Sequence, residues 1–392
     1  MKRIVIYLSL FIMAFICFSV SLTTDIAYAE GEIKEEIEKE IEDNLNSLID
    51  EDLNAYFSNL ENNFGVNLKD FIKGIISGNI TISAENVLEG FVQAVKSGIK
   101  SSLLSLISIV VLAILSSLSK SLTAGFKKEG IETIIHYAIY GAIICTLAIM
   151  VGDVVKEVSG TLNSINELVD RLFPVILTLL TAIGGVGGAS FLQPITLLVS
   201  NLVIKLIINI IIPIFYATIV FTFVGNLSDT IKLEKCNKTL KSIASWTLGI
   251  VFSLVTSFVA MQGLVGASID TITIKSTKFA LSSYIPILGG YLAEGFDIVM
   301  ASCVLIKNAL GLSSFLILIG ILITPIVKIL LFSISLKLIS AFIEPIGENK
   351  VASLLYDTSS GLNILLASLG GVAFIIFIIL SLVIGAYNGG IV

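Results

Sequence analysis

The chain has 392 residues, of which 55% are hydrophobic and 14% are charged, and its formal net charge is −6. Soluble domains carry about 25% charged residues, so this composition excludes an ordinary soluble protein. With a mean hydropathy of +0.99, the sequence predicts an all-α polytopic membrane protein. Only two basic residues are arginine, Arg3 and Arg171. Nucleic-acid recognition relies on arginine, so we expect no nucleic-acid partner.

The N-terminus predicts a secretory signal peptide over residues 1–29. Two basic residues precede an apolar stretch over 4–20, and an A-x-A cleavage pattern follows at 27–29. The alternative is an uncleaved anchor. In both cases Glu30 lies outside the cytoplasm.

Residues 30–98 predict a small extracytoplasmic helical region with an acidic face. Eleven acidic residues stand against two lysines within 30–52, while apolar residues recur every three or four positions and continue through Phe57 and Leu60. That period is typical of an amphipathic helix. Its apolar stripe either packs on the neighbouring helices or binds a partner.

Six later segments have the length and apolarity that a spanning helix needs, about 20 residues. Two further apolar segments are less suited to spanning: 172–189 contains the sequence GGVGG, and 285–306 contains Glu294 and Asp297. The six expected spans are 101–119, 133–152, 195–224, 242–267, 312–341 and 362–387.

Aligning the chain with itself at an offset of 112 predicts an internal repeat. Pro174 then falls on Pro286, and Pro213 falls on Pro325. Identities are sparse, and chance alignment is the alternative. Paired Gly/Pro-interrupted segments in two halves are typical of transporter folds. The resulting division is a two-helix lead over 99–155 and two repeats, 171–267 and 284–388.

The positive-inside rule favours a topology with six spans. If 172–189 and 285–306 dip into the membrane and return, the lysine-rich loop 225–241 lies in the cytoplasm, as that rule prefers. If both segments cross, the chain has eight spans and this loop lies outside. The C-terminus is extracytoplasmic in either topology. The glycines expected at the re-entrant turns are Gly184, Gly185, Gly187, Gly188, Gly289 and Gly290.

Motifs for catalysis or cofactor binding are missing from the sequence. It contains no P-loop pattern, no C-x-x-C pair and a single histidine, His136. We therefore expect no enzyme activity, no cofactor and no metal.

Polar residues within the apolar segments predict a buried polar site instead. A charge at mid-bilayer is costly and usually pairs or faces a cavity. We expect Lys205 to pair with Asp297, with Glu294 as second choice. The alternative is that Lys205, like Lys328 and Lys337, snorkels to the membrane surface. The candidate site consists of Asn201, Lys205, Asn209, Glu294 and Asp297.

Three long stretches of the chain resemble the stage III sporulation protein AE family of endospore-forming bacteria. They read QGLVGASIDTITIKSTKFALSSYIPILGG from 262, FDIVMASCVLIKNALG from 296 and AFIEPIGENKVASLL from 341. The resemblance runs from the signal peptide to the C-terminus. Its motif-like points are Lys278-Phe279, Pro286, Gly289, Asp297, Lys307-Asn308-Ala309, Gly311 and Pro345-Ile346-Gly347.

The resemblance implies a role in a channel complex between mother cell and forespore. Such proteins lie in the mother-cell membrane around the engulfed forespore. They act with the other stage III sporulation A-operon proteins, and indirectly with stage II sporulation protein Q. Within that complex the chain is either a membrane platform or a permease-like subunit. The alternative outside sporulation is a stand-alone secondary transporter of a small solute.

Overall fold

A computed structural model describes residues 129–227, 233–284, 289–346 and 349–385, together with parts of a helix between 96 and 118. Within 262–298 it describes the course of the backbone but not the side chains. The expected signal peptide, nearly all of the acidic region over 30–98 and the C-terminus beyond 385 therefore lie outside the described residues. The expected first span, 101–119, is represented by a short apolar helix, Leu106–Leu115.

The first long helix, α6, joins two segments that the sequence analysis separates. It runs without a break over Glu129–Ala182, 54 residues, and so contains both the expected span 133–152 and most of 172–189. The residues between them are polar only on the outer face of the helix, because Val158, Leu162 and Ile165 of the same stretch are fully buried. An amphipathic stretch of this kind continues a helix. The expected domain boundary at 155–171 thus falls inside α6.

The sequence GGVGG reverses the chain at the end of α6. Gly184 has a φ of 82°, a left-handed conformation that is strained for residues with a side chain. Its N–H donates to the Thr181 carbonyl at 3.0 Å, and the Gly185 N–H donates to the Leu180 carbonyl at 2.8 Å. These two bonds form a Schellman motif, which ends a helix by satisfying its last carbonyl groups.

Gly185 is required for a different reason. A Cβ added there would lie 2.7 Å from the Leu180 carbonyl oxygen, which is too close for any real side chain. Gly187 and Gly188 belong to the first turn of the next helix, α7 (Val186–Leu198). Gly289 and Gly290 begin α10. The structure contains no bilayer, so the re-entrant position of these glycines stays a prediction.

The returning arm contains two π-helical segments. After α7 come η1 (Val199–Ile204) and η2 (Ile207–Ile211), and then α8 (Ile212–Leu227). Pro213 is the second residue of α8, just after η2 ends. It has no N–H to donate, and in a regular α-helix its ring would clash with the carbonyl of Asn209. The wider π turns accommodate that clash, and together these elements form one arm over 186–227.

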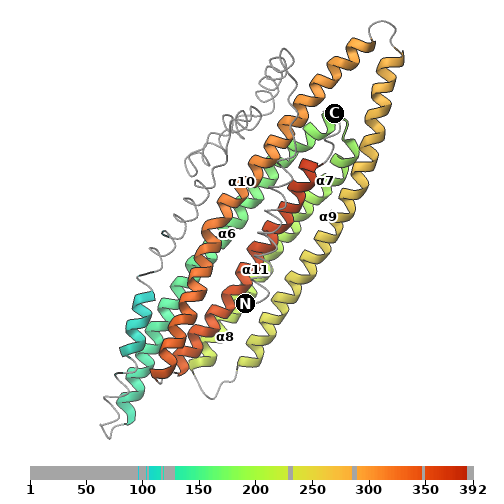
Figure 1. Cartoon of the computed structure of the whole chain (residues 1–392). Coiled ribbons are helices and arrows are strands. Elements are labelled where there is room, and N and C mark those ends of the chain that lie inside the picture. Colours follow the sequence, from blue (N-terminus) through green and yellow to red (C-terminus); the bar gives the residue numbers. More distant parts are fainter. Residues whose placement is uncertain are drawn as a thin grey trace.

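Three further helices complete the bundle: α9 (Glu234–Tyr284), α10 (Gly289–Ile343) and α11 (Asn349–Gly385), with a short 3₁₀ turn, η3 (Glu344–Ile346), after α10. Successive long elements run in opposite directions along one bundle (Figure 1). The end of α8 and the beginning of α9 lie at the lower end of that view, as do the end of α10 and the beginning of α11. The α6–α7 turn lies toward the other end.

The second expected hairpin, 285–306, differs from the first. From Gly289 onward it is the uninterrupted beginning of α10, which carries on through the expected span 312–341. At an offset of 112, the turn at Gly184 has no counterpart, because residue 296 is helical. The arms after the two prolines do correspond: α8 ends at Leu227 and α10 at Ile343, and each is followed by a returning helix. The internal repeat stays a prediction.

Apolar side chains fill the interior of the bundle, and many also cover its outside. Buried residues such as Phe215, Leu362 and Val372 belong to one continuous core. On the surface, Trp246, Leu254 and Met261 of α9 are 66–70% exposed. Among the described residues, five helices are long and apolar enough to cross a membrane: Tyr137–Ala182, Leu202–Leu227, Glu234–Met261, Val299–Ile343 and Asn349–Gly385.

Candidate functional site: polar contacts of the helical bundle

An ion pair joins α6 to α10, near the middle of α6 and in the second half of α10. The Nζ atom of Lys328 contacts the Oε2 atom of Glu157, and their side chains are only 19% and 26% exposed. Lys328 follows Pro325 inside α10, and Glu157 lies on the flank of α6. A half-buried pair of this kind fixes the register of two antiparallel helices, because a shift by one turn would leave both charges unpaired.

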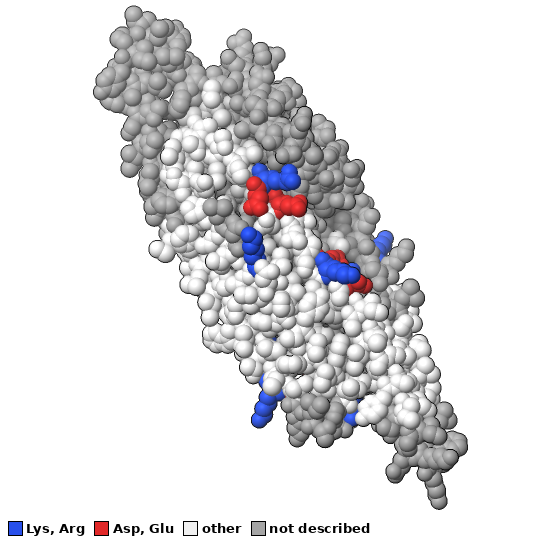
Figure 2. All heavy atoms as spheres, turned by 180° about the vertical axis from the view of Figure 1, so that it is seen from behind, with Lys and Arg blue, Asp and Glu red and all other residues white. Residues whose placement is uncertain are grey.

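The outer face of α6 carries a row of polar residues beside this pair. We call it the α6 polar stripe. Its members are spaced alternately by three and four residues, so they follow one line along the helix, and all of them are exposed. Figure 2 shows acidic and basic side chains gathered near the middle of one face of the bundle, with further basic side chains toward its lower end. The stripe consists of Asp153, Lys156, Gly160, Asn163, Glu167 and Asp170.

Lys307 is a lysine that the bundle buries completely, with 0% exposure. Its Nζ atom lies 3.5 Å from the carbonyl oxygen of Ile384. Because α11 ends at Gly385, that carbonyl is one of the last four of the helix, which lack intrahelical donors and carry the negative end of the helix dipole. A Cβ on Gly311, one turn along α10, would lie 2.6 Å from Ile384 Cγ1, so the glycine permits the close approach.

Serine side chains tie α10 to α11 along the rest of their contact. Ser359 Oγ donates to the Ser333 carbonyl at 2.8 Å, and the two hydroxyl groups lie 3.0 Å apart. Nearer the connection, Ser340 Oγ donates to the Ala352 carbonyl at 2.7 Å. Small hydroxyl residues let helix backbones approach closely and hydrogen-bond across membrane helices.

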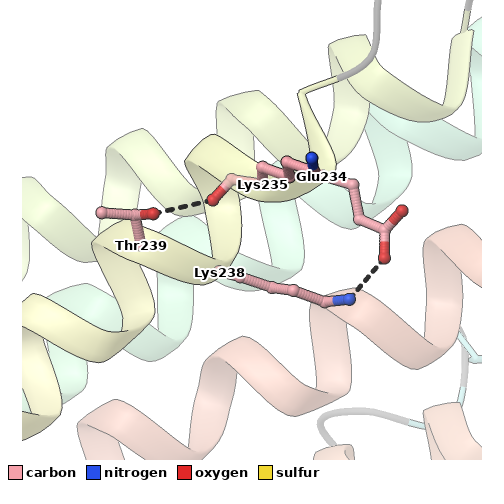
Figure 3. A network of polar contacts seen from close by, with 4 residues as sticks. All are labelled: Glu234, Lys235, Lys238 and Thr239. Carbon is pink, nitrogen blue, oxygen red and sulfur yellow. Dashed lines mark hydrogen bonds and ion pairs between the residues drawn. The ribbon is translucent and has the colours of Figure 1, made fainter.

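The beginning of α9 combines a surface ion pair with a buried contact. Glu234 and Lys238 pair at 2.5 Å on the surface, and Thr239 Oγ1 donates to the Lys235 carbonyl at 2.9 Å (Figure 3). On the inner face, Asn237 Nδ2 donates to Thr222 Oγ1 of α8 at 2.8 Å. The buried bond closes the α8–α9 hairpin. The exposed pair contributes little, since it is screened by solvent.

The structure places part of the sequence-derived polar site on the π-helical arm. Lys205 lies between η1 and η2, Asn209 lies within η2, and both are exposed rather than buried in the bundle. The side chains of Asn201, Glu294 and Asp297 are outside the described residues, so the pairing of Lys205 with Asp297 stays a prediction. π-Helical insertions often occur at functional sites, so the arm that carries Lys205 and Asn209 stays a candidate functional site.

Sequence reasoning missed the buried contacts that the fold creates. It left Glu157 unassigned, between the two-helix lead over 99–155 and the repeat over 171–267, and it considered Lys328 only as a lysine that snorkels. Lys307 entered solely as a point of family resemblance. A lysine inside an apolar run was the available signal, but the partners, Glu157 and the end of α11, are 171 and 77 residues away.

These contacts hold helices together, and none has the arrangement of a catalytic centre. Within the described part of the chain, no group of three His, Cys, Asp or Glu side chains could hold a metal ion. The fold and its polar contacts thus define a class: an all-α polytopic membrane protein in which an interhelical ion pair and hydroxyl hydrogen bonds join the described helices.

Comparison with known proteins assigns the family. Residues 66–387 match the family described as stage III sporulation protein AE, so the chain belongs to the stage III sporulation protein AE family and has a role in sporulation. Stage III sporulation protein AE of Bacillus subtilis (strain 168) is 25% identical over 283 residues, which cover 72% of this chain and 71% of that protein. No solved structure matches the chain. The family is not a known enzyme family.

Proposed function

We propose that the chain is an integral membrane component of the channel complex that connects the mother cell with the engulfed forespore. In this proposal it lies in the mother-cell membrane around the forespore, with both termini outside the cytoplasm. Its partners are the other stage III sporulation A-operon proteins and, through them, stage II sporulation protein Q. Family membership together with five helices of spanning length supports the proposal.

The molecular role we favour is a membrane platform. One observation carries this choice: the described interior is a continuous apolar core, and several of the polar groups within it tie one helix to another. Contacts such as Ser359–Ser333 and Asn237–Thr222 make a bundle of fixed geometry, which suits a base for assembly.

A permease-like subunit is the second candidate, and the α6 polar stripe favours it. A row of exposed charged residues on a helix of spanning length does not belong against lipid. A transport path in this protein would then follow the outside of α6 rather than the apolar interior.

Deleting the gene tests the sporulation role. We expect engulfed forespores to form but to fail to sustain late transcription, with restoration by the wild-type gene in trans. Normal late transcription and a normal spore yield in the deletion strain would reject the proposal and favour a stand-alone solute transporter.

A further inference from the structure

The outer face of α9 changes from charged to apolar near the beginning of the helix. Of the five described helices of spanning length, α9 is the least buried: 22% of its most apolar stretch is buried, against 39–56% in the other four. Lys235 and Lys238 are exposed in its first two turns, and residues 242–261 contain no charged side chain. Further along, Trp246 is 70% exposed and Leu254 is 66% exposed. The boundary between the two parts therefore lies between Lys238 and Trp246.

Exposed aromatic side chains of two neighbouring helices lie at this boundary. Trp246 is the only tryptophan of the chain. On α11, Tyr356 is 57% exposed, and the carbonyl oxygen of the next residue, Asp357, accepts a hydrogen bond from Lys241 Nζ at 3.1 Å. Lys241 precedes Trp246 by about 7 Å along the helix, so the two aromatic residues lie close to one level. Tryptophan and tyrosine concentrate at membrane–water interfaces, and we therefore place a membrane surface at this boundary.

A groove on the outer face of α9 crosses the boundary. Lys235, Lys238 and Thr239 belong to successive turns at its polar end (Figure 3). Glu234 pairs with Lys238 at 2.5 Å, and Lys235 leaves this end with one positive charge in excess. The lining includes Lys238, Thr239 and Ser242 at the polar end and Ile243, Trp246 and Ile250 at the apolar end.

An anionic phospholipid has its chemical groups in the same order as this groove. Its phosphate lies at the membrane surface, where the ammonium groups of Lys235 and Lys238 can bind it as compact point charges. The exposed hydroxyl group of Ser242 offers a neutral hydrogen-bond partner beside them. Below the phosphate, the acyl chains meet Trp246 and Leu254. Basic groups at a membrane surface are a recognised means of binding anionic head groups.

A second copy of the chain suits this face less well. Two copies in one membrane share their orientation, so symmetric packing through α9 would bring the lysines of one copy against the lysines of the other. A helix of a different membrane protein is the competing occupant, because Ser245 and Gly249 on this face are small and small residues permit close helix contact. Such a helix would need an acidic residue at the depth of Lys235, whereas every anionic phospholipid carries its charge there.

We propose that the groove on α9 binds an anionic phospholipid of the leaflet at the end of the bundle where α9 begins. The head-group phosphate contacts Lys235 and Lys238, and the acyl chains lie along Trp246, Ile250 and Leu254. The proposal rests on the membrane location proposed above and goes beyond it by assigning a ligand. The bound lipid covers the spanning helix that the rest of the described bundle covers least.

The fluorescence of Trp246 tests the proposal directly. Because the chain has a single tryptophan, its emission reports on this groove alone. The purified full-length protein is reconstituted in phosphatidylcholine vesicles that contain increasing fractions of phosphatidylglycerol with brominated acyl chains, which quench tryptophan on contact. In the matched series, phosphatidylcholine carries the bromine. We expect phosphatidylglycerol to bind about fivefold or more tightly than phosphatidylcholine, since each lysine near an anionic lipid contributes about that factor.

Three variants connect this preference to the lysines. Lys235→Gln and Lys238→Gln together should lower it below about twofold. Glu234→Gln removes the competing carboxylate from Lys238 and should raise the preference by about twofold or more. Lys337→Gln, on α10, is the matched control and should leave the preference unchanged.

Three results would overturn the proposal while leaving the membrane role intact. Equal quenching by the two brominated lipids would mean that ordinary bilayer lipid fills the groove. Quenching by neither lipid would mean that a protein neighbour covers Trp246. A preference that soluble glycerol phosphate abolishes would mean that the groove takes free phosphate rather than a lipid.

Discussion

The pairing of Lys328 with Glu157 shows how far a single residue's role depends on the fold. In the sequence, Lys328 is a lone cation inside an apolar run, and two interpretations of it are available, snorkelling or pairing. Its partner is 171 residues away, in a stretch that sequence reasoning leaves unassigned. Only the continuous course of α6 through that stretch brings the carboxylate to α10.

Removing one member of this pair should destabilise the protein more than removing both. Lys328→Met leaves the Glu157 carboxylate unpaired, and Glu157→Gln leaves the ammonium unpaired. Because the pair is half-buried, we expect each single change to cost about 1–3 kcal/mol, and the double variant to recover part of it. The loss of stability in each variant is measured by the thermal aggregation of the detergent-solubilised protein and by the protein's level in the membrane.

The matched control is Lys337→Met, which changes a half-exposed lysine further along α10. It should lower stability by less than Lys328→Met does. A double variant whose loss equals the sum of the two single losses would show that the pair contributes no coupling.

A second residue-scale prediction concerns Lys307. Its ammonium group lies beside the last carbonyls of α11, so Lys307→Met removes the cation while keeping most of the buried volume. We expect a loss of about 1–3 kcal/mol and faster proteolysis at the C-terminal end of α11. Unchanged protection there would mean that apolar packing alone holds the end of this helix.

Alanine substitutions at two adjacent glycines of α11, Gly370 and Gly371, test how closely α9 packs against α11. A Cβ on Gly371 would lie 1.9 Å from Phe252 Cε2, whereas a Cβ on Gly370 would meet nothing within 4 Å. Alanine favours a helix over glycine by about 1 kcal/mol. Gly370→Ala should therefore be neutral or stabilising, and Gly371→Ala should lower the thermal stability because the Phe252 ring must move.

Equal stability of the two alanine variants would show that the Phe252 ring relocates at no cost. The comparison is direct, because the helix, the residue type and the chemical change are the same at both positions.

The elements themselves could be predicted from the sequence only in part. Three of the six expected spans, 133–152, 242–267 and 312–341, fall inside single long helices. The span 195–224 falls inside the arm over 186–227, and 362–387 overlaps α11 up to Gly385. Runs of leucine, isoleucine and valine thus identify buried or lipid-facing helix well. The expected helix ends were wrong where polar residues lie on only one face of a helix that continues. In the sequence, residues 153–171 resemble a break between two helices, yet the buried side chains of Val158 and Leu162 keep the inner face of α6 apolar. The turn at Gly184 was predictable from glycine chemistry, and its depth in a membrane was not.

The candidate site was less predictable than the elements. Lys205 and Asn209 were recognised from their spacing along one helix face, but the π-helical segments around them depend on the geometry before Pro213. The α6 polar stripe is visible in the sequence as a row of polar residues every three or four positions. That the stripe lies beside the ion pair of Glu157 with Lys328 follows only from the fold.

At the scale of the whole molecule, the fold makes a clear prediction about sidedness. The end of α8 and the beginning of α9 lie at the same end of the bundle as the end of α10 and the beginning of α11 (Figure 1), and lysine-rich connections belong in the cytoplasm. In intact cells, cysteines replacing Lys235 and Lys238 should be shielded from an impermeant thiol reagent added outside.

A cysteine replacing Gly385, at the end of α11, should react with the same reagent. Both sets are placed in a background without native cysteines. Strong labelling at position 235 from outside would contradict this orientation of the bundle.

The uninterrupted length of α6 and α10 has a mechanical consequence. At 54 and 55 residues, each helix is a rod of about 80 Å, and the ion pair between them acts as a pivot near the middle of α6. Tilting such a rod by about 5° displaces its far tip by about 7 Å relative to its base. Wherever either helix moves as a unit, a small tilt at the lysine-rich base therefore produces a much larger displacement at the opposite tip.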